Sequence, residues 1–183
     1  MRIISGTLKG KKLFLPLDKK TRPLKDLTKE SIFNLIEHSN KLKINISKSK
    51  ILDAFSGSGS IGFECISRGA VKVTFIENYK PAIKILEKNL QKFKIKNKCE
   101  IYNCDFLNFN VINQYDIIFL DPPFAFKELS KIFDLIKLKN YLKREGIIIL
   151  HRHKSEREML PSYIKETEVR TYGISKIFFL ELN

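Results

Sequence analysis

The tetrapeptide Asp121-Pro122-Pro123-Phe124 follows an apolar run that is typical of a buried strand. Its residue types suit an exocyclic amine on a nucleic-acid base, a poor nucleophile because its lone pair is delocalised into the ring. The Asp121 carboxylate and the Pro122 carbonyl could accept the two amine hydrogens, and consecutive prolines would stiffen the turn that carries them. Phe124 offers a ring on which the base could stack. The turn therefore predicts methyl transfer to an amine by positioning, with no metal and no covalent intermediate.

An ordinary Pro-Pro turn, with Phe124 in the core, is the alternative interpretation of this tetrapeptide. Its place in the chain favours the chemical reading, because it follows the fourth expected strand of an alternating β/α pattern. Ligands of open α/β sheets bind at the carboxyl ends of the strands, near the point where the strand order reverses.

A glycine-rich turn supplies a candidate cofactor site. Residues 57–62 match G-x-G-x-x-G after a strand and before a helix, and Gly57 and Gly59 would allow a tight turn and close approach of a ligand. Glu77 ends the next strand about 20 residues later, where a carboxylate can accept hydrogen bonds from both ribose hydroxyls. A solvated residue at the strand end is the alternative for Glu77. The pattern alone also fits dinucleotides.

Two further carboxylates favour S-adenosylmethionine (S-adenosyl-L-methionine) over NAD. Asp53 would repel a pyrophosphate, but it could engage the ammonium end of the methionine moiety, directly or through water. Asp105 could accept a hydrogen bond from the adenine amino group, with Phe106 near the ring, although it could also be a turn-capping aspartate. The neighbouring Phe55 and Asn78 complete the expected cofactor site.

The elements that must position these residues alternate between strand and helix, which predicts an α/β fold with a mostly parallel sheet and helices on both faces. We expect strands at residues 51–55, 71–76, 99–102, 115–120 and 146–150, and a closing antiparallel pair at 164–171 and 176–182 around Gly173. We expect helices from the glycine turn to Arg68, from Pro81 through Phe93, and over residues 126–138 and 155–161.

The N-terminal residues have a different pattern. Apolar-basic runs at residues 2–4 and 11–15 predict a hairpin, and a helix with Asp26 as a possible N-cap would place Leu27, Ile32, Leu35 and Ile36 on its apolar side. We therefore expect an extension over residues 1–45 and a catalytic domain over residues 46–183, forming one compact unit.

Composition limits the classes of protein. The 183 residues suit one domain, and 34 Lys and Arg against 20 Asp and Glu give a net charge of +14. This excess favours a polyanionic partner, although a lysine-biased composition would also produce it. Apolar runs are too short to span a membrane, and the first residues lack the apolar core of a signal peptide, so we expect a cytoplasmic protein. Three cysteines without a C-x-x-C pair predict no metal site.

The chain resembles the bacterial 16S ribosomal RNA guanine-N2 methyltransferases of the RsmD type. This resemblance implies a Rossmann-like, seven-stranded class I fold that depends on S-adenosylmethionine, with an N-terminal β-hairpin extension. It implies methyl transfer to N2 of one guanine in 16S rRNA, within the small ribosomal subunit or its assembly intermediate. The segments that carry the resemblance span most of the chain: residues 1–6, 9–13, 22–23, 30–34, 52–64, 67–70 and 121–124.

The resemblance also assigns residues to roles. It implies a catalytic motif at residues 121–124, cofactor contacts at Gly57, Gly59, Glu77 and Asp105, and RNA contacts from the hairpin and the following turn. The basic candidates for RNA contact are Arg2, Lys9, Lys11, Lys12 and Arg22.

The chain departs from the family pattern in two places. Leu24 and Lys25 replace a polar pair, and Leu27 and Lys29 stand where arginines are common, which affects the expected RNA contacts. Residues 151–154 are less acidic than the family pattern. They are expected to form either a solvated basic loop or a phosphate contact beside the site.

Three other functions compete with the rRNA methyltransferase interpretation. A DNA adenine-N6 methyltransferase would use the same tetrapeptide, but it needs additional chain to recognise a DNA sequence. A dinucleotide-dependent oxidoreductase would share the glycine turn. A non-catalytic RNA-binding assembly factor would have no need of an intact Asp121 and Glu77. We expect the protein to act as a monomer.

Overall fold

A seven-stranded sheet forms the centre of the computed structural model, which describes residues 1–17 and 24–183. The order of the strands is β3-β2-β1-β4-β5-β7-β6, and the first five run parallel. β7 lies antiparallel between β5 and β6, which confirms the expected closing pair and the expected α/β class. The strands are β1 (Lys50–Ala54), β2 (Lys72–Glu77), β3 (Cys99–Asn103), β4 (Tyr115–Leu120), β5 (Leu142–His153), β6 (Ile164–Tyr172) and β7 (Ser175–Leu182).

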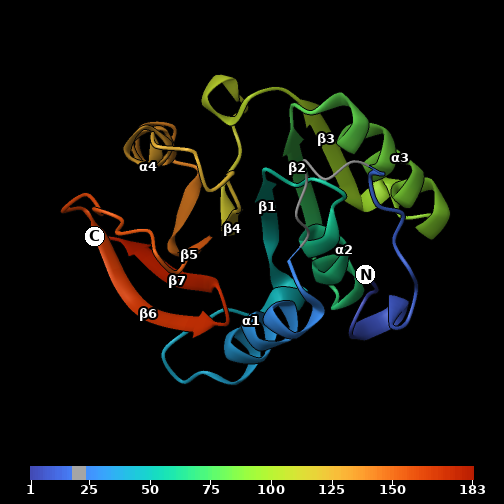
Figure 1. Cartoon of the computed structure of the whole chain (residues 1–183), viewed down its shortest axis with the longest axis horizontal. Coiled ribbons are helices and arrows are strands. Elements are labelled where there is room, and N and C mark those ends of the chain that lie inside the picture. Colours follow the sequence, from blue (N-terminus) through green and yellow to red (C-terminus); the bar gives the residue numbers. More distant parts are fainter. Residues whose placement is uncertain (18–23) are drawn as a thin grey trace.

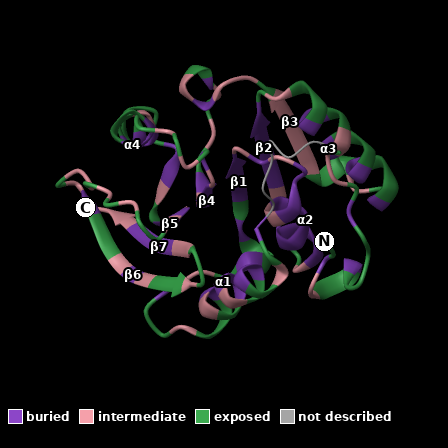
Figure 2. Ribbon diagram, in the orientation of Figure 1, coloured by how far each residue is buried: buried purple, intermediate pink, exposed green. Residues whose placement is uncertain are grey.

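Helices cover both faces of this sheet (Figure 1). Alternate residues of the strands point to opposite faces, so Ile117 and Phe119 belong to one apolar core and Ile118 and Leu120 to the other. The first core is covered by α1 (Asp26–His38), α2 (Ser60–Ser67) and α3 (Lys80–Phe93), and the second by α4 (Leu129–Leu138). The central strands and α2 are almost wholly buried, whereas α3 and α4 expose their outer sides (Figure 2).

The sequence explains the bounds of α3. Pro81 occupies its first turn, where a missing N–H costs nothing, and the expected stripe of Ile83, Leu86, Leu90 and Phe93 is buried against the sheet. Lys94 then adopts a left-handed conformation with φ of 56°, which ends the helix. The short 3-10 helices η1 (Gly6–Leu8), η2 (Ile46–Lys48), η3 (Lys96–Lys98) and η4 (Phe106–Asn108) complete the elements of the described chain.

The N-terminal segment doubles back as a short hairpin, as expected: Arg2 and Lys12 form an antiparallel bridge, and the N–H groups of Ile3 and Leu13 donate to the carbonyls of Lys11 and Met1 at 3.0 and 3.2 Å. Its tip lies on the C-terminal end of α2, because Gly6, at a φ of 76°, approaches Ser67 so closely that a Cβ would lie 1.8 Å from the Ser67 carbonyl oxygen. The backbone N–H groups of Ile4 and Ser5 donate to the Glu64 carboxylate at 2.8 and 2.9 Å. Contacts with α2 therefore hold the tip of this hairpin in place.

Three sequence-based predictions need correction. Residues 155–161 form turns and irregular chain instead of a helix, since β5 extends to His153 and the backbone then turns. Leu27 is exposed, because the face of α1 that meets the core carries Thr28, Lys29, Ile32, Phe33 and Ile36. Residues 151–153 belong to β5 and are neither a loop nor fully solvated. Within residues 1–17 and 24–183, none of the helices combines the length and the apolar character that a membrane span requires.

Candidate active site

The candidate site lies where β1 and β4 run side by side. Ala54 pairs with Leu120 at the last rung of this parallel pair, so the glycine turn and the Asp121 turn emerge next to each other at the carboxyl edge. The strand order also reverses here, because β2 and β3 lie on one side of β1 while β4 and β5 continue on the other. Such a reversal opens a crevice for ligands between the flanking turns.

The glycine turn is held in a conformation that few residues adopt. Phe55, Gly57 and Gly59 have φ values of 61°, 54° and 82°, and the left-handed region costs a phenylalanine about 1 kcal/mol. A Cβ on Gly59 would lie 2.4 Å from Leu86, so this glycine allows α2 and α3 to pack closely. A Cβ on Gly57 would meet no protein atom within 4 Å. The backbone beside Gly57 therefore faces open space, as a ligand-binding turn requires.

Glu77 joins the glycine turn to the end of β2. One carboxylate oxygen accepts a hydrogen bond from the Gly57 N–H at 2.7 Å, and the other accepts from the N–H groups of Asn78 and Tyr79 at 3.0 and 2.8 Å. The side chain is buried, which contradicts the interpretation of Glu77 as a solvated strand-end residue. Its carboxylate is oriented by the backbone on both sides of the site.

Asp105 extends this chain of contacts to β3. It caps η4 by accepting from the Leu107 N–H at 2.9 Å, and its other oxygen accepts from the Asn78 side-chain amide at 3.3 Å. The turn-capping role is therefore present, and it leaves the half-buried carboxylate at the same edge as Glu77. The structure thus brings together Gly57, Glu77, Asn78 and Asp105.

The two phenylalanines expected at the cofactor differ in exposure. Phe106 is 1% exposed and packs with Phe55 and Phe109, at centroid distances of 5.9 and 6.4 Å. η4 turns this ring into the core, and its expected place near the adenine ring stays a prediction. Phe55 is half-buried and rests on Phe106 and Phe126, so it is the ring that this edge presents.

Asp53 lies beneath the glycine turn, 3% exposed. Its carboxylate accepts a hydrogen bond from the Gly62 N–H at 2.9 Å, in the first turn of α2. Burial raises the pKa of Asp53 well above its ordinary value of 3.8, and the nearby charges of Asp121 and Glu77 raise it further against the lowering effect of the Gly62 hydrogen bond. The hydrogen bond from Gly62 therefore ties Asp53 to the N-terminal end of α2. Ionising the Asp53 carboxyl group is costly when no cation lies beside it.

The residues of the Asp121 turn differ in exposure. Asp121 and Phe124 are half-buried, Pro122 is buried and Pro123 is exposed. The Pro123 carbonyl accepts from the Phe126 N–H at 2.8 Å, which closes the turn. Among the residues that the structure describes, none donates a hydrogen bond to the Pro122 carbonyl, so that oxygen has capacity for a ligand amine.

Two residues at the end of β5 hold this turn, a role that the sequence analysis did not assign to residues 151–154. His151 Nδ1 lies 2.8 Å from Asp121 Oδ1, and its ring meets Phe124 edge-on at 5.5 Å. Arg152 is 1% exposed, donates to the carbonyls of Pro123, Phe124 and Phe126 at 3.1, 3.2 and 3.1 Å, and pairs with Glu158. The available signal was the position of the segment, directly after the strand that neighbours β4.

The described basic residues expected at RNA lie on the N-terminal segment, which contacts both α2 and α3. Arg2, Lys9, Lys11 and Lys12 are all exposed, and Arg22 falls outside the described residues. The two ends of the N-terminal segment reach the glycine turn: the buried Lys29 donates to the Arg2 carbonyl at 2.8 Å and to Ser60 at 3.2 Å, and Asn89 bonds both Phe14 and Ser58. Arg2 therefore lies nearer to the candidate site than Lys9, which follows η1 at the far end of α2.

The cysteines take no part in this arrangement. Burial raises the pKa of the Cys65 thiol well above its ordinary value and that of Cys99 to about 12, so neither is a nucleophile at neutral pH. In the described part of the chain, no three His, Cys, Asp or Glu side chains form a group able to hold a metal ion.

Solved structures share this architecture. An Escherichia coli protein described as a methyltransferase superposes with a TM-score of 0.84 at 27% sequence identity, covering 100% of this chain and 98% of that one. A Haemophilus influenzae protein described as a methylase gives a TM-score of 0.78 at 33% identity, with 99% and 97% covered. The fold is therefore that of the class I methyltransferases.

Sequence relatives point the same way. A protein named ribosomal RNA small subunit methyltransferase D from Haemophilus influenzae is 37% identical over 179 residues, covering 95% of this chain and 90% of the relative. A protein of the same name from Escherichia coli K12 is 32% identical over 150 residues, covering 81% and 72%. The model of the family described as Conserved hypothetical protein 95 matches residues 1–181. The chain therefore belongs to this family, together with the proteins named ribosomal RNA small subunit methyltransferase D.

Proposed function

We propose that this protein transfers a methyl group from S-adenosylmethionine to the exocyclic N2 amine of a guanine in 16S rRNA. The observation that carries the proposal is the placement of Asp121 and the Pro122 carbonyl directly beside the glycine turn, at the reversal of strand order. Methyl transfer of this kind is an in-line displacement, in which most of the catalysis comes from bringing donor and acceptor together.

The residues at the carboxyl edge fit the cofactor chemically. Glu77 would accept hydrogen bonds from the ribose hydroxyls, and Asp105 from the adenine amino group, while Asn78 donates to both carboxylates. Asp53 would meet the ammonium group, and the open space at Gly57 would admit the ligand to the backbone. When bound, S-adenosylmethionine supplies an electrophilic methyl group on a sulfonium.

At the reacting amine, the chain supplies acceptors and a face. The free capacity of the Asp121 carboxylate and of the Pro122 carbonyl would bind the two amine hydrogens and direct the nitrogen lone pair toward the methyl donor. Phe124 would stack on the base, which is worth about 1–3 kcal/mol in comparable contacts. The proton that the methylated amine loses would pass to Asp121 or to water.

The relatives' names and the charge of the chain support RNA as the substrate. Proteins named ribosomal RNA small subunit methyltransferase D match this chain at up to 37% identity, and a net charge of +14 favours binding to phosphates. We include in the proposal that residues 1–45 form the RNA-facing extension of a catalytic domain at 46–183, and that a monomer acts on the small subunit or its assembly intermediate.

Small ribosomal subunits from a strain that lacks this modification test the proposal. With methyl-labelled S-adenosylmethionine, the wild-type protein should label 16S rRNA, and nuclease digestion should release N2-methylguanosine. Asp121→Ala should lower kcat roughly 100- to 1000-fold, since it removes one preorganised acceptor. Isothermal titration should show that its affinity for S-adenosylhomocysteine, the product of the cofactor, is nearly unchanged. Labelling of adenine in duplex DNA, with unlabelled subunits, would show that the substrate is wrong.

A further inference from the structure

The Asp121 carboxylate has a partner that sequence analysis left unassigned. His151 lies in β5, the parallel neighbour of β4, and its side chain is 11% exposed. Its Nδ1 atom is 2.8 Å from Asp121 Oδ1, and its Nε2 atom is 2.9 Å from the Ser175 hydroxyl on β7. The ring is therefore held from both sides, by Asp121 directly after β4 and by Ser175 at the start of β7.

These contacts are compatible with one neutral tautomer of the ring. If Nδ1 carries the proton, it donates to Asp121 Oδ1, and Nε2 accepts a hydrogen bond from the Ser175 hydroxyl. A carboxylate held through one oxygen keeps the other, Oδ2, for a second hydrogen bond. The direction of Oδ2 is then set by the ring and not by rotation of a free Asp121 side chain.

The surroundings of His151 reinforce this arrangement. The Phe124 ring meets the rings of His151 and His153 edge-on, with centroids 5.5 and 5.4 Å away. His151 thus contacts the acceptor for the amine and also the ring proposed to stack on the base. A shift of this imidazole would move both.

We propose that His151 is a positioning residue, which donates from Nδ1 to Asp121 Oδ1 and so aims Oδ2 at the substrate amine. The catalytic consequence rests on the proposed methyl transfer, whereas the contact itself does not. Ser175 supports the ring by donating to Nε2. His151 acts through Asp121 and has no bond to the substrate, so its loss should lower kcat and leave cofactor binding intact.

Three substitutions of His151 separate the effect of its hydrogen bond to Asp121 from the effect of its ring volume. Asparagine places its amide nitrogen close to the position of imidazole Nδ1, glutamine reaches that of Nε2, and phenylalanine retains ring volume without a donor. His151→Phe and His151→Gln should lower kcat roughly 10- to 100-fold, as expected for a misdirected catalytic group, with KM for S-adenosylmethionine unchanged. His151→Asn should recover most of the loss. Equal activity of the Asn and Gln variants would overturn the proposal.

Nitrogen NMR of the imidazole rings tests the contact without any substrate. The chain has three histidines, and comparison with His151→Asn identifies the signals of His151. At pH 8, the wild-type spectrum should show the Nδ1–H tautomer, and Asp121→Ala should shift it toward the Nε2–H form. An Nε2–H tautomer in the wild type, insensitive to Asp121→Ala, would refute the assignment. A wild-type protein inactive on every nucleic acid would instead count against the proposed function. The NMR result would still show whether His151 Nδ1 donates to Asp121.

Discussion

Two buried carboxylates of the candidate site differ in how well the fold stabilises their charge. Asp53 and Glu77 are both buried carboxylates, yet Glu77 accepts three backbone hydrogen bonds while Asp53 accepts one, from Gly62. Burying a carboxylate with few partners is costly, and burial is the main reason that the pKa of Asp53 is raised. The cost of keeping a carboxylate in this position supports the proposed role of Asp53 in binding the ammonium group of the cofactor.

Asp53→Asn should therefore stabilise the protein in a pH-dependent way. The raised pKa means that the folded chain retains a proton between 3.8 and the folded pKa, where the unfolded chain has lost it. In that window, stability falls as pH rises, and above it the full penalty remains. Asparagine carries no charge and still offers an oxygen to Gly62, so the gain in Tm over wild type should be small near pH 4 and grow toward neutral pH.

Thermal unfolding of both proteins across this pH range measures the effect, and Asp53→Asn should also weaken binding of S-adenosylmethionine. Asp116→Asn is the matched control, because it removes a carboxylate that is paired with Lys143 at 2.8 Å. A gain for Asp53→Asn that did not vary with pH would show that the cost of burying its charge had been misjudged.

Among the elements, β5 does more than complete the sheet. Its last residues extend past the rung at Leu120 and present His151 and Arg152 to the turn that follows β4. The Arg152 guanidinium satisfies three carbonyl oxygens of residues 123–126 and pairs with Glu158. A turn with two prolines has few N–H groups with which to hold itself, so this neighbouring strand supplies the donors.

Arg152→Met should lower the free energy of unfolding by about 3–5 kcal/mol, because it leaves the partly buried Glu158 and the carbonyls of the turn without their donor. Arg152→Lys should lose less, since an ammonium can still pair with Glu158 but lacks the planar set of donors. Urea unfolding gives these values, and hydrogen exchange should show faster opening of the Phe126 N–H. The double variant Arg152→Met with Glu158→Gln should recover part of the loss; a double variant no more stable than Arg152→Met would exclude the unpaired carboxylate as the cause.

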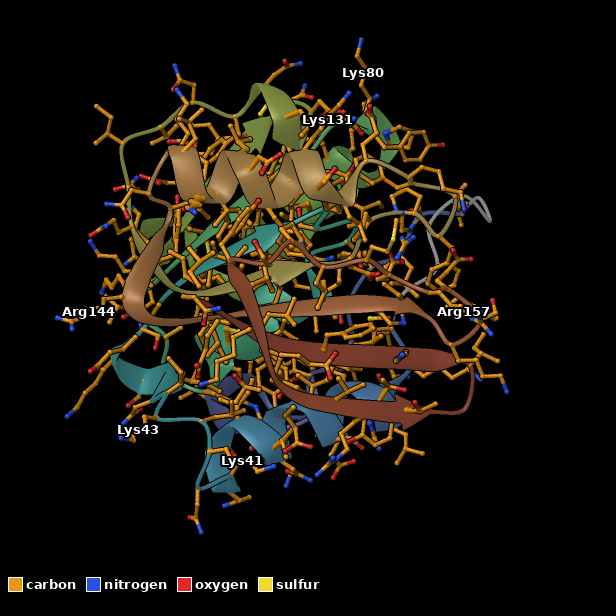
Figure 3. All side chains as sticks on the ribbon, turned by 90° about the vertical axis from the view of Figure 1, so that its left-hand side faces the viewer. Lys41, Lys43, Lys80, Lys131, Arg144 and Arg157 are labelled. Atoms are coloured by element: carbon orange, nitrogen blue, oxygen red, sulfur yellow. The ribbon has the colours of Figure 1, made fainter. Side chains whose placement is uncertain are left out.

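At the scale of the whole molecule, positive charge is spread over several faces. Lys43 and Arg144 line an open pocket of about 370 Å³ at the amino-terminal edge of the sheet, together with Lys48 and Lys143. Figure 3 shows Lys43 and Arg144 projecting from the side of the molecule opposite Arg157, which follows β5 near the candidate site. Net charge alone therefore does not identify the face that would bind RNA. Substituting separate groups of basic residues tests which face it is.

Replacing Lys9, Lys11 and Lys12 together with glutamine should weaken binding to small subunits and flatten its salt dependence. If each lysine contacts one phosphate of single-stranded RNA, the slope of log K against log salt should fall in magnitude by about 2. The matched control replaces Lys43, Lys48 and Arg144, which removes the same charge from the pocket at the amino-terminal edge of the sheet. Filter binding at several salt concentrations gives both slopes, and equal changes would mean that the N-terminal segment is no special RNA contact.

Local patterns were enough to predict most elements. The stripe on α3, the run of β4 and the glycine turn after β1 all follow from residues that are neighbours in the chain, because periodicity and turn chemistry act locally. The N-terminal segment shows the limit: its residues suit a hairpin and it forms one, but only the fold shows that the N–H groups of its tip donate to Glu64 and Ser67 of α2.

By itself, the sequence predicted a chemistry for the turn at Asp121, and it determined the glycine turn and the alternation that places both turns at one edge. Only the tertiary structure decided what surrounds them. It placed β7 between β5 and β6, turned Phe106 into the core, and brought His151 and Arg152 onto the Asp121 turn. The reason is physical: each of these outcomes depends on contacts between residues that are distant in the chain. A local sequence pattern does not specify which of those residues come together.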